Sequence, residues 1–467
     1  PTVMLFVDHP GHPYALRYME VFRRRFGMPA VCVYFDAGAL RGEARRLAGL
    51  GSDVLSRVYV ASPEDVDGIA EVLGERHDIR AVVPYIETAL TPSVQLGRRL
   101  GVSWAENPAL ELFRDKHALK RHVASVPGGP RVNSVALVNG FDDVEVALAS
   151  GGFDRFVLKP NDGFGNSNIG FFDSSSPVDE VAAHVRLIGG SILMEEFLAG
   201  PEYEVNGQVD GEGRATVLGV YLEVREPLNG RPNIQTGSRT VHRDDPAFQP
   251  LVDYVEGLVS LSGLRRSPFH AEVKFDDRGP CLVEVAARLA GAGGAEDMDV
   301  NHGGELDTFD LSAHYYLTAE SYGPIPVDWD YYHSHVVNTV MGPAATTERI
   351  YEAAGEEQVE QLPEFRGWVV KLKLGQRVRR TVDLESAAYM VRLITRTDEQ
   401  MDAAVDYVRR TVQWNDRSEG VTRFVKRAWM ATTLVANRIT SKLAQRKLHV
   451  QHIPDSAERS HDGVRSR

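Results

Sequence analysis

Two glutamates on either side of a turn are the residues in this sequence whose types and spacing most directly suggest chemistry. Glu272 lies in HAEVKF and Glu284 in CLVEV, and the turn DDRGP joins these two apolar runs. With a five-residue loop, Phe275 pairs with Cys281, and Glu272 lies directly opposite Glu284 on one face of the hairpin. A slip of one residue in register would put the two carboxylates on opposite faces, and the hairpin alone leaves both arrangements open.

Two carboxylates side by side repel each other unless a divalent cation lies between them. Ligation by oxygen atoms alone suits Mg²⁺, which usually keeps several waters and bridges to phosphate groups. A buried carboxylate is also costly unless it is paired or bound to a metal, and Glu284 is the centre of an apolar run. In the paired register the two glutamates therefore predict a magnesium site that serves a phosphate-bearing substrate.

A glycine-rich loop, VLKPNDGFGNSNIG, is the second candidate. It places Lys159 at the end of an apolar strand, followed by Gly163, Gly165 and Ser167. Glycines allow backbone N–H groups to close over phosphate oxygens, and a lysine adds a positive charge. The loop is not a P-loop, because its lysine precedes the glycines and no G-K-[ST] follows. An ordinary glycine-rich hairpin is the alternative interpretation.

The stretch ILMEEFLAGPEYEV is the third candidate. Glu195 and Glu196 end an apolar strand, Leu198 follows, and Glu202 begins the next strand after a turn. Groups at such a strand end could hold the edge of an adenine, and the later acid could hold ribose hydroxyls. Taken by itself, the stretch is equally a strand end with solvated charges.

The elements that must position these residues change in character along the chain. The runs TVMLFVD, VCVYF, RVYVA and DIRAVVPYI alternate with helical segments, which predicts a parallel α/β unit over about the first 100 residues. This unit has no G-x-G-x-x-G turn, so the sequence gives little support to dinucleotide binding. Later segments indicate antiparallel strands and amphipathic helices, among them QPLVDYVEGLVSLSGL. The fold class is therefore α/β and α+β with several domains.

We expect five parts. They are an N-terminal α/β domain at 1–105, a subdomain with the glycine-rich loop at 106–194, a subdomain with the metal site at 195–328, a small C-terminal α+β module at 329–416, and a basic amphipathic helix with a tail at 417–467. The last part is basic in an otherwise acidic chain, and it either packs on the protein itself or contacts a partner or an anionic surface.

The composition of the 467 residues excludes several classes of protein. With 43% hydrophobic residues, 25% charged residues and a formal net charge of −13, general binding of nucleic acid is disfavoured. Cys32 and Cys281 lie in apolar runs and are expected to be core residues rather than a disulfide pair or metal ligands. No apolar run is long enough for a membrane span and no signal peptide is evident, so we expect a cytoplasmic protein.

The order of these parts resembles the ATP-grasp superfamily. Lys116 comes first, then Lys159 with its glycine loop, then EEFLAGPE, then the acid pair that ends in Arg288. The resemblance covers roughly residues 80 to 320, and HAEVKFDDRGPCLVEVAARLAG is most similar to the L-amino-acid ligases that form dipeptides. It implies an N-terminal parallel α/β (pre-ATP-grasp) domain, an ATP-grasp fold, and a small C-terminal α+β module.

The resemblance also implies roles for individual residues. Lys116 and Lys159 would hold the ATP phosphates, and the loop with Gly163, Gly165 and Ser167 would close over them. Glu195, Glu196 and Leu198 would line the adenine, and Glu202 would bind the ribose. Glu272 and Glu284 would bind Mg²⁺, and Arg288 would face the transferred phosphoryl group. The implied cofactors are ATP and two Mg²⁺ ions, with Mn²⁺ as a substitute.

One position departs from the superfamily. Most members have an asparagine two residues after the second glutamate, where this chain has Ala286. One oxygen ligand is therefore missing, and water or a substrate oxygen must replace it. The alanines before Arg288 favour the dipeptide-ligase branch over an inactive site, because the acids, lysines and arginine are all present.

The implied reaction converts a carboxylate to an acyl phosphate with ATP, after which an amine forms an amide and phosphate leaves. The substrates would be amino acids or peptides, in a peptide natural-product pathway, and the enzyme could be a homodimer. The alternatives are transfer of an aminoacyl group to a carrier protein, and a nucleotide-binding regulator without turnover. Candidate substrate residues, each of which could equally be an ordinary structural residue, are Glu87, Arg239, His242, His302 and Glu305.

Overall fold

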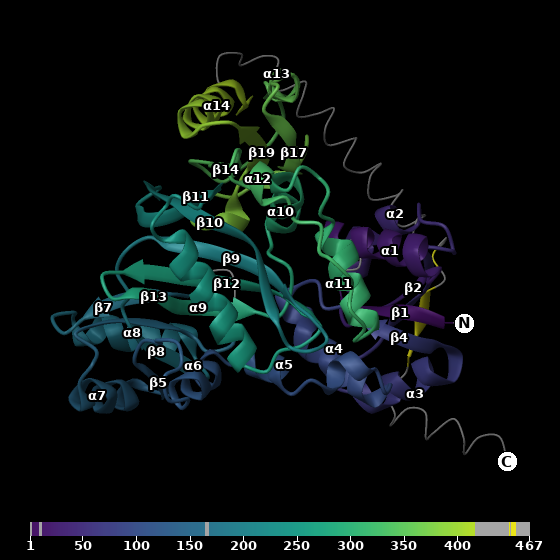
Figure 1. Cartoon of the computed structure of the whole chain (residues 1–467), viewed down its shortest axis with the longest axis horizontal. Helices are drawn as coiled ribbons and strands as arrows, with labels where there is room; N and C mark the ends of the chain where they lie inside the picture. The colour runs from purple at the N-terminus through teal and green to yellow at the C-terminus, as the bar shows by residue number, and fades with distance from the viewer. Residues whose placement is uncertain (1, 9–11, 164–167, 416–447, 449, 454–467) are drawn as a thin grey trace.

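The computed structural model describes residues 2–8, 12–163, 168–415, 448 and 450–453 (Figure 1). Gly165 and Ser167 of the predicted phosphate loop lie outside these residues. So does most of the predicted basic helix and tail at 417–467.

A five-stranded parallel sheet forms the N-terminal unit, with strand order β21-β3-β2-β1-β4. Its strands are β1 (Thr2–Val7), β2 (Ala30–Tyr34), β3 (Leu55–Val60), β4 (Asp78–Val82) and β21 (Val450–His452). The helices that connect them are α1 (Pro13–Phe26), α2 (Ala37–Leu47), α3 (Val66–Arg76) and α4 (Glu87–Arg99). The inner strands β1 and β2 are apolar and buried along almost their whole length, because helices cover both faces of such a sheet. The expected parallel α/β unit is confirmed.

Strand β21 was not expected. It comes from the C-terminal segment, pairs in parallel with β3 and forms one edge of the N-terminal sheet. The amide of Ile453 donates to the carbonyl of Val60 at 2.8 Å, and the Ile453 side chain is buried in the N-terminal core. Residues far from the first 105 thus complete this unit.

A four-stranded antiparallel sheet, with order β5-β8-β6-β7, forms a separate lobe with its own apolar core. Its strands are β5 (Val135–Val138), β6 (Arg155–Pro160), β7 (Gly170–Asp173) and β8 (Ile192–Glu196), and its helices are α6 (Lys116–Ala124), α7 (Phe141–Ser150) and α8 (Val178–Ile188). The predicted boundary between residues 194 and 195 falls inside β8, so the third predicted part begins with the end of this lobe. In Figure 1 the lobe lies beside the central sheet, at the lower left.

The central sheet has eight antiparallel strands in the order β13-β12-β9-β10-β11-β14-β19-β17. They are β9 (Glu202–Val209), β10 (Ala215–Leu228), β11 (Arg231–Thr240), β12 (Ser267–Asp276), β13 (Gly279–Ala286), β14 (Val336–Gly342), β17 (Phe365–Val370) and β19 (Tyr389–Thr395). The predicted amphipathic helix is α9 (Phe248–Leu261), which buries Leu251, Val255 and Leu258. The predicted C-terminal module has its own core, but three of its strands extend this same sheet.

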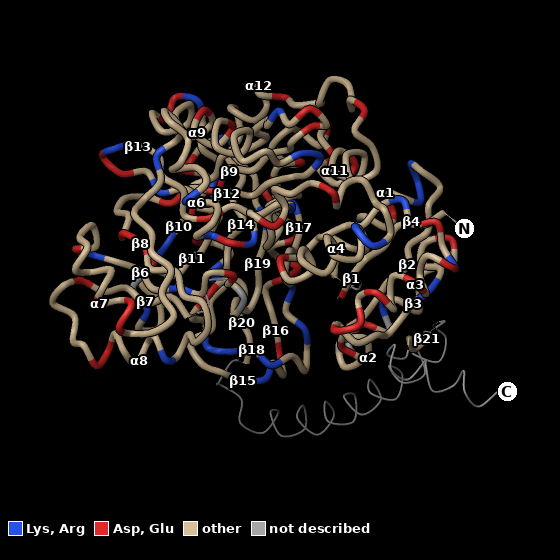
Figure 2. The backbone as a smooth tube through the Cα atoms, turned by 90° about the horizontal axis from the view of Figure 1, so that it is seen from below, with Lys and Arg blue, Asp and Glu red and all other residues tan. Residues whose placement is uncertain are grey.

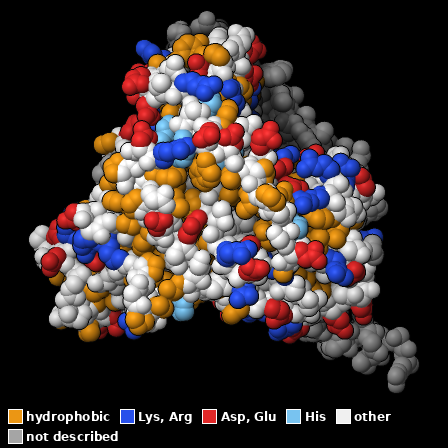
Figure 3. Space-filling view, viewed as in Figure 1, with side chains coloured by type: hydrophobic (Ala, Val, Ile, Leu, Met, Phe, Trp, Pro, Cys, Tyr) orange, Lys and Arg blue, Asp and Glu red, His pale blue; other side chains and the backbone are white. Residues whose placement is uncertain are grey.

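Shorter elements complete the described chain. They are η1 (Ser103–Glu106), α5 (Ala109–Leu112), α10 (Gly294–Asn301), α11 (Thr308–Leu317), α12 (Trp329–Tyr332), β15 (Glu348–Arg349), β16 (Ala353–Ala354), α13 (Glu356–Glu360), β18 (Arg377–Val378), η2 (Leu384–Ser386), α14 (Asp398–Thr411) and β20 (Gln413–Trp414). Figure 2 shows Lys and Arg interspersed with Asp and Glu along the described chain. Figure 3 shows the same mixture of charges on one face of the molecule. None of the described helices combines the length and the apolar character that crossing a membrane requires.

Candidate active site

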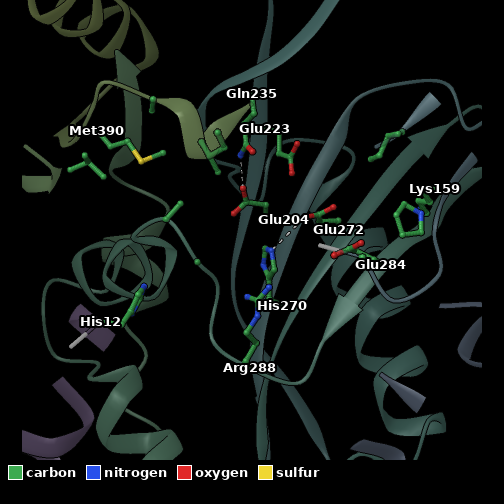
Figure 4. Close-up of a pocket in the computed structure, with 18 of the residues that line it drawn as sticks. His12, Lys159, Glu204, Glu223, Gln235, His270, Glu272, Glu284, Arg288 and Met390 are labelled. Carbon is green, nitrogen blue, oxygen red and sulfur yellow. Dashed lines mark hydrogen bonds and ion pairs between the residues drawn. The ribbon is translucent and has the colours of Figure 1, made fainter. Parts of the chain in front are cut away.

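A pocket of about 490 Å³ opens on one face of the central sheet (Figure 4). All the parts of the chain described above contribute to it: His12 precedes α1, Lys159 comes from β6, the acids come from the central sheet, and Met390 comes from β19. Of the predicted site residues, it is lined by Lys116, Lys159, Gly163, Glu272, Glu284 and Arg288. The fold thus brings together residues that are far apart in the sequence.

The hairpin of β12 and β13 pairs Glu272 with Glu284. The predicted five-residue loop is wrong, however, since Phe275 pairs with Pro280 and a tight two-residue turn joins the strands. That turn alone would have put Glu272 opposite Val283. A β-bulge next to Glu272 shifts the register by one residue and returns Glu284 to the same face.

The two paired carboxylates differ in their affinity for a proton. Burial alone would raise the pKa of Glu272, but the hydrogen bond and charge of His270, together with Arg225, lower this pKa to about 2. Burial raises the pKa of Glu284, and Glu272 adds to that rise, although Lys116 Nζ lies 3.3 Å from its carboxylate and opposes it. A divalent cation between the two acids would remove this conflict, so the donor set fits Mg²⁺.

Further carboxylates stand beside this pair on the same face of the sheet. Glu204 of β9 is directly opposite Glu272, and Glu202, Glu223 and Glu272 bring carboxylate oxygens within 4.8 Å of one another. Ala286, which stands where most of the superfamily has an asparagine, is buried opposite His270 and brings no side-chain oxygen to the site.

Lys116 and Lys159 approach the acid pair from the lobe. Lys116 Nζ donates to the carbonyl of Gly163 at 2.6 Å, which ties the start of α6 to the glycine-rich loop. Lys159 Nζ is 2.6 Å from the Glu195 carboxylate. Lys120, which the sequence did not single out, reaches the same carboxylate at 2.6 Å and is almost completely buried.

Glu195 therefore holds two lysines, although the sequence placed it at the adenine. Burial alone would raise the pKa of Glu195, but Lys120 and Lys159 lower it to about 2. The arrangement orients Lys159, whose side chain lines the pocket.

We expect Glu195→Gln to lower the free energy of unfolding by about 3–5 kcal/mol at pH 7, because two buried lysines lose their counter-charge. The pKa of Glu195 is depressed from 4.5 to about 2, so its contribution is present above pH 4.5 and lost as the pH falls toward 2. Urea unfolding at pH 7 and pH 3 should thus show a smaller gap between variant and wild type at the lower pH. An equal gap at both pH values contradicts the assignment, and exposed Glu106→Gln serves as the control.

Arg288 lies at the edge of the pocket, two residues beyond the end of β13. Its Nε donates to Glu87 at 2.7 Å, and Arg114 Nη1 donates to the other oxygen of the same carboxylate at 2.6 Å. Glu87, in the first turn of α4, thus orients Arg288 between the N-terminal unit and the central sheet. Glu87 itself does not line the pocket, and each of its carboxylate oxygens accepts a hydrogen bond from one arginine, so its role with a substrate stays a prediction.

The residues predicted to hold the nucleoside do not line this pocket. Glu196 pairs with Arg278 at 2.7 Å, and Leu198 is buried. Glu202 is held by Lys274 at 3.0 Å and Arg225 at 3.1 Å. Their roles with adenine and ribose stay predictions.

Arg239 is outside the pocket. It pairs with Asp398 at 3.2 Å and Asp402 at 2.5 Å, both on α14 behind the sheet. The reason is a register shift in β11, where Gln235 pairs with Arg225 but Gly237 pairs with Val224. Without that shift, Arg239 would share the face of Gln235, which does line the pocket.

The other three predicted substrate residues are also elsewhere. His242 Nε2 lies 2.8 Å from the carbonyl of His335, and Glu305 is exposed. His302 is fully buried, with Nε2 2.7 Å from the carbonyl of Leu218 and Nδ1 3.0 Å from the amide of Asp328. Burial lowers its pKa, so His302 is a neutral core histidine.

Sequence reasoning missed five residues of the site region: Lys120, Glu204, Glu223, Gln235 and His270. Alternation offered a signal for two of them, because residues two apart on a strand share a face. His270 is two residues before Glu272, and Glu204 is two residues after Glu202. Strand alternation offered no comparable signal for Gln235, because its position depends on the irregular register of β11.

Residues 155–296 match the ATP-grasp domain family. This segment contains Lys159, both acids of the pair and Arg288. The chain thus carries an ATP-grasp domain, as the resemblance predicted.

Known proteins extend this result to the whole fold. The L-amino acid ligase of Bacillus licheniformis has 16% identity and a TM-score of 0.71, covering 89% of this chain and 98% of that one. The biotin carboxylase domain of Hydrogenobacter thermophilus 2-oxoglutarate carboxylase, solved with magnesium-ADP and bicarbonate, has 13% identity and a TM-score of 0.61, covering 88% of this chain and 90% of that one. Both likenesses establish the ATP-grasp architecture, including the N-terminal and C-terminal parts.

A third similar protein is named after the compound that it makes. Dapdiamide A synthase of Enterobacter agglomerans is 25% identical over 222 residues, which cover 46% of this chain and 52% of that protein. The chain therefore matches about half the length of the curated relatives that resemble it.

Proposed function

We propose that this protein is an ATP-dependent, ADP-forming ligase that activates a carboxylate as an acyl phosphate and joins it to the amine of an amino acid or peptide. The observation that carries the proposal is one pocket lined by Lys116, Lys159, Glu272, Glu284 and Arg288. Two lysines, two paired acids and an arginine are what phosphoryl transfer to a carboxylate requires. The similarity to an L-amino acid ligase and to dapdiamide A synthase supports this choice among ATP-grasp reactions.

In the first step a carboxylate oxygen of the substrate attacks the γ-phosphorus of ATP, and ADP leaves. Lys116 and Lys159 neutralise charge on the phosphates, and Arg288 faces the transferred group. Glu87 fixes the guanidinium of Arg288 by a hydrogen bond of 2.7 Å, so the arginine needs little reorganisation as charge develops.

In the second step the amine nitrogen attacks the acyl carbon, phosphate leaves, and the nitrogen loses a proton. Glu272 and Glu284 would hold Mg²⁺, which supplies positive charge to the phosphates when bound.

The number of ions and the use of Mn²⁺ stay predictions, as do a homodimer, a cytoplasmic location and a place in peptide natural-product biosynthesis.

Release of ADP from a panel of carboxylates and amines tests the function. We expect ADP, phosphate and an amide product, identified by its mass, when a suitable carboxylate and amine are both present. Production of ADP that requires a carrier protein would favour aminoacyl transfer instead. Tight ATP binding with no ADP from any pair would indicate a regulator without turnover.

A further inference from the structure

Arg114 is a partly buried arginine that does not line the pocket, yet it contacts two parts of the site at once. Its Nη1 donates to the carboxylate of Glu87 at 2.6 Å, and its Nη2 donates to the carbonyl of Asp162 at 2.9 Å. Glu87 holds Arg288, and Asp162 directly precedes Gly163 at the start of the glycine-rich loop. Arg114 therefore joins the arginine of the proposed reaction to the loop that the sequence predicts at the phosphates.

The contact with the loop is part of a wider junction between the start of α6 and the end of β6. Residues 114–117 are hydrogen-bonded to residues 161–163. Besides the bond from Arg114 to Asp162, these are Asn161 Nδ2 to the carboxylate of Asp115 at 2.9 Å, Lys116 Nζ to the carbonyl of Gly163 at 2.6 Å, and the amide of His117 to Asn161 Oδ1 at 3.0 Å. The start of the loop is thus fixed relative to Arg114, and Arg114 extends the junction to the N-terminal unit through Glu87.

The carboxylate of Glu87 is divided between two arginines, with one oxygen for each. Arg288 Nε donates to Oε2 at 2.7 Å, and Arg114 occupies Oε1. Arg288 Nη1 donates to the carbonyl of Leu289 at 3.0 Å, which leaves Nη2 for the transferred phosphoryl group. Without Arg114, both oxygens of Glu87 would be open to Arg288, and a bidentate pair would turn the guanidinium away from the pocket.

The charges of these three residues favour the same arrangement. Burial alone would raise the pKa of Glu87, but the positive charges of Arg288 and Arg114 lower it. Two arginines around one carboxylate keep a net positive charge at the edge of the pocket, whereas Glu87 and Arg288 alone would form a neutral pair. Arg114 therefore preserves the positive charge that Arg288 needs for an anionic group.

We propose that Arg114 is a positioning residue that couples the start of the glycine-rich loop to Arg288. Held by the carbonyl of Asp162, it occupies one oxygen of Glu87 and keeps Arg288 directed at the transferred phosphoryl group. This inference rests on the proposed ligase function. Because Arg114 does not line the pocket, it acts on the reaction through Glu87 and Arg288.

A double-mutant cycle tests the coupling, because residues that act through one another have non-additive effects. ADP formation is measured with enzyme in excess, saturating ATP, Mg²⁺ and a mixture of the standard amino acids. We expect Arg114→Met to lower the rate about 10- to 30-fold. In the Arg288→Met background the same substitution should lower it less than about threefold, since the group that Arg114 positions is gone.

The KM for ATP separates positioning of Arg288 from a general loss of the nucleotide site. We expect the KM of Arg114→Met to stay within about threefold of wild type, because Asn161 and Lys116 still hold the start of the loop. A loss that falls on the rate and spares this KM is what a residue acting on the transition state produces.

Arg131→Met is the matched control. Like Arg114, Arg131 is partly buried and contacts one carboxylate and one carbonyl, those of Asp276 and Gly279, each at 2.9 Å. Both partners lie at the end of β13 opposite to Arg288. Any loss of rate in Arg131→Met should therefore be the same, within about twofold, with and without Arg288→Met.

Arg114→Lys provides the same test if Arg114→Met does not fold. Lysine keeps a positive charge beside Glu87, but its single nitrogen cannot replace both guanidinium nitrogens that bridge Glu87 and Asp162. We expect a loss of rate of about 5- to 10-fold in the wild-type background and less than about twofold in the Arg288→Met background.

Two results overturn the proposal. An unchanged rate in a folded variant of Arg114 would show that this residue positions nothing, and an equal loss in both backgrounds would show that it acts independently of Arg288. In both cases the wild-type protein still releases ADP, and the ligase function stands. Absence of ADP release from the wild-type protein with every carboxylate and amine would instead refute the ligase function, and this proposal with it.

Discussion

Glu284→Gln is expected to lower kcat about 10³-fold, which corresponds to about 4 kcal/mol of transition-state stabilisation. The substitution keeps the shape of the side chain but removes one of the two paired charges opposite Glu272. Because burial already raises the pKa of Glu284, the neutral amide should be tolerated in the fold. We therefore expect the melting temperature to stay within a few degrees of wild type, or to rise.

Magnesium titration of the Glu284→Gln variant separates a metal role from a general loss of activity. The concentration of Mg²⁺ needed for half-maximal turnover should increase at least about tenfold. Glu305→Gln, at an exposed position outside the pocket, should change neither kcat nor the magnesium requirement. Near-normal activity of Glu284→Gln would show that the acid pair is not the metal site.

Arg288→Met is expected to have the second large effect, a loss in kcat of about 10³-fold with the KM for ATP within about threefold. Arginines that stabilise a transferred phosphoryl group act mainly in the transition state, so the loss falls on kcat. Arg288 is held for this purpose by Glu87, which keeps its second partner, Arg114, in the variant. We therefore expect the variant to fold and to bind ATP.

The distinction from a purely structural role comes from kinetics and stability measured together. If Arg288 served only to join the N-terminal unit to the central sheet, Arg288→Met would lower the melting temperature and leave kcat per folded molecule unchanged. Arg243→Met is the control, because Arg243 is largely exposed and pairs with Asp330 outside the main pocket. It should retain full turnover.

The sequence by itself determined the main elements and the order of the parts. Apolar runs alternating with helices predicted the N-terminal parallel sheet, because a sheet covered on both faces needs strands that are apolar throughout. The same local patterns located α9 and the β12–β13 hairpin. The order of lysines, glycine loop, acids and arginine also predicted the ATP-grasp domain that residues 155–296 contain.

Irregularities in the strands were decided only by the tertiary structure. The pairing of Glu272 with Glu284 was predicted with the wrong loop, and a bulge supplied the missing residue of register. In β11 the register shift near Thr236 moved Arg239 to the opposite face. A bulge depends on how two strands meet their neighbours, and no composition or period within one strand encodes it.

Long-range pairing was the other feature that the sequence could not provide. Glu195 was predicted at the adenine, and only the fold shows that Lys120 and Lys159 lie on its two carboxylate oxygens. Glu204 carried no signal beyond strand alternation, yet it is a buried acid of the pocket without a cationic partner among the described residues. The sequence determined which charged groups are available. The fold decided which of them neutralise one another and which remain open to a substrate, because that depends on distances between segments far apart in the chain.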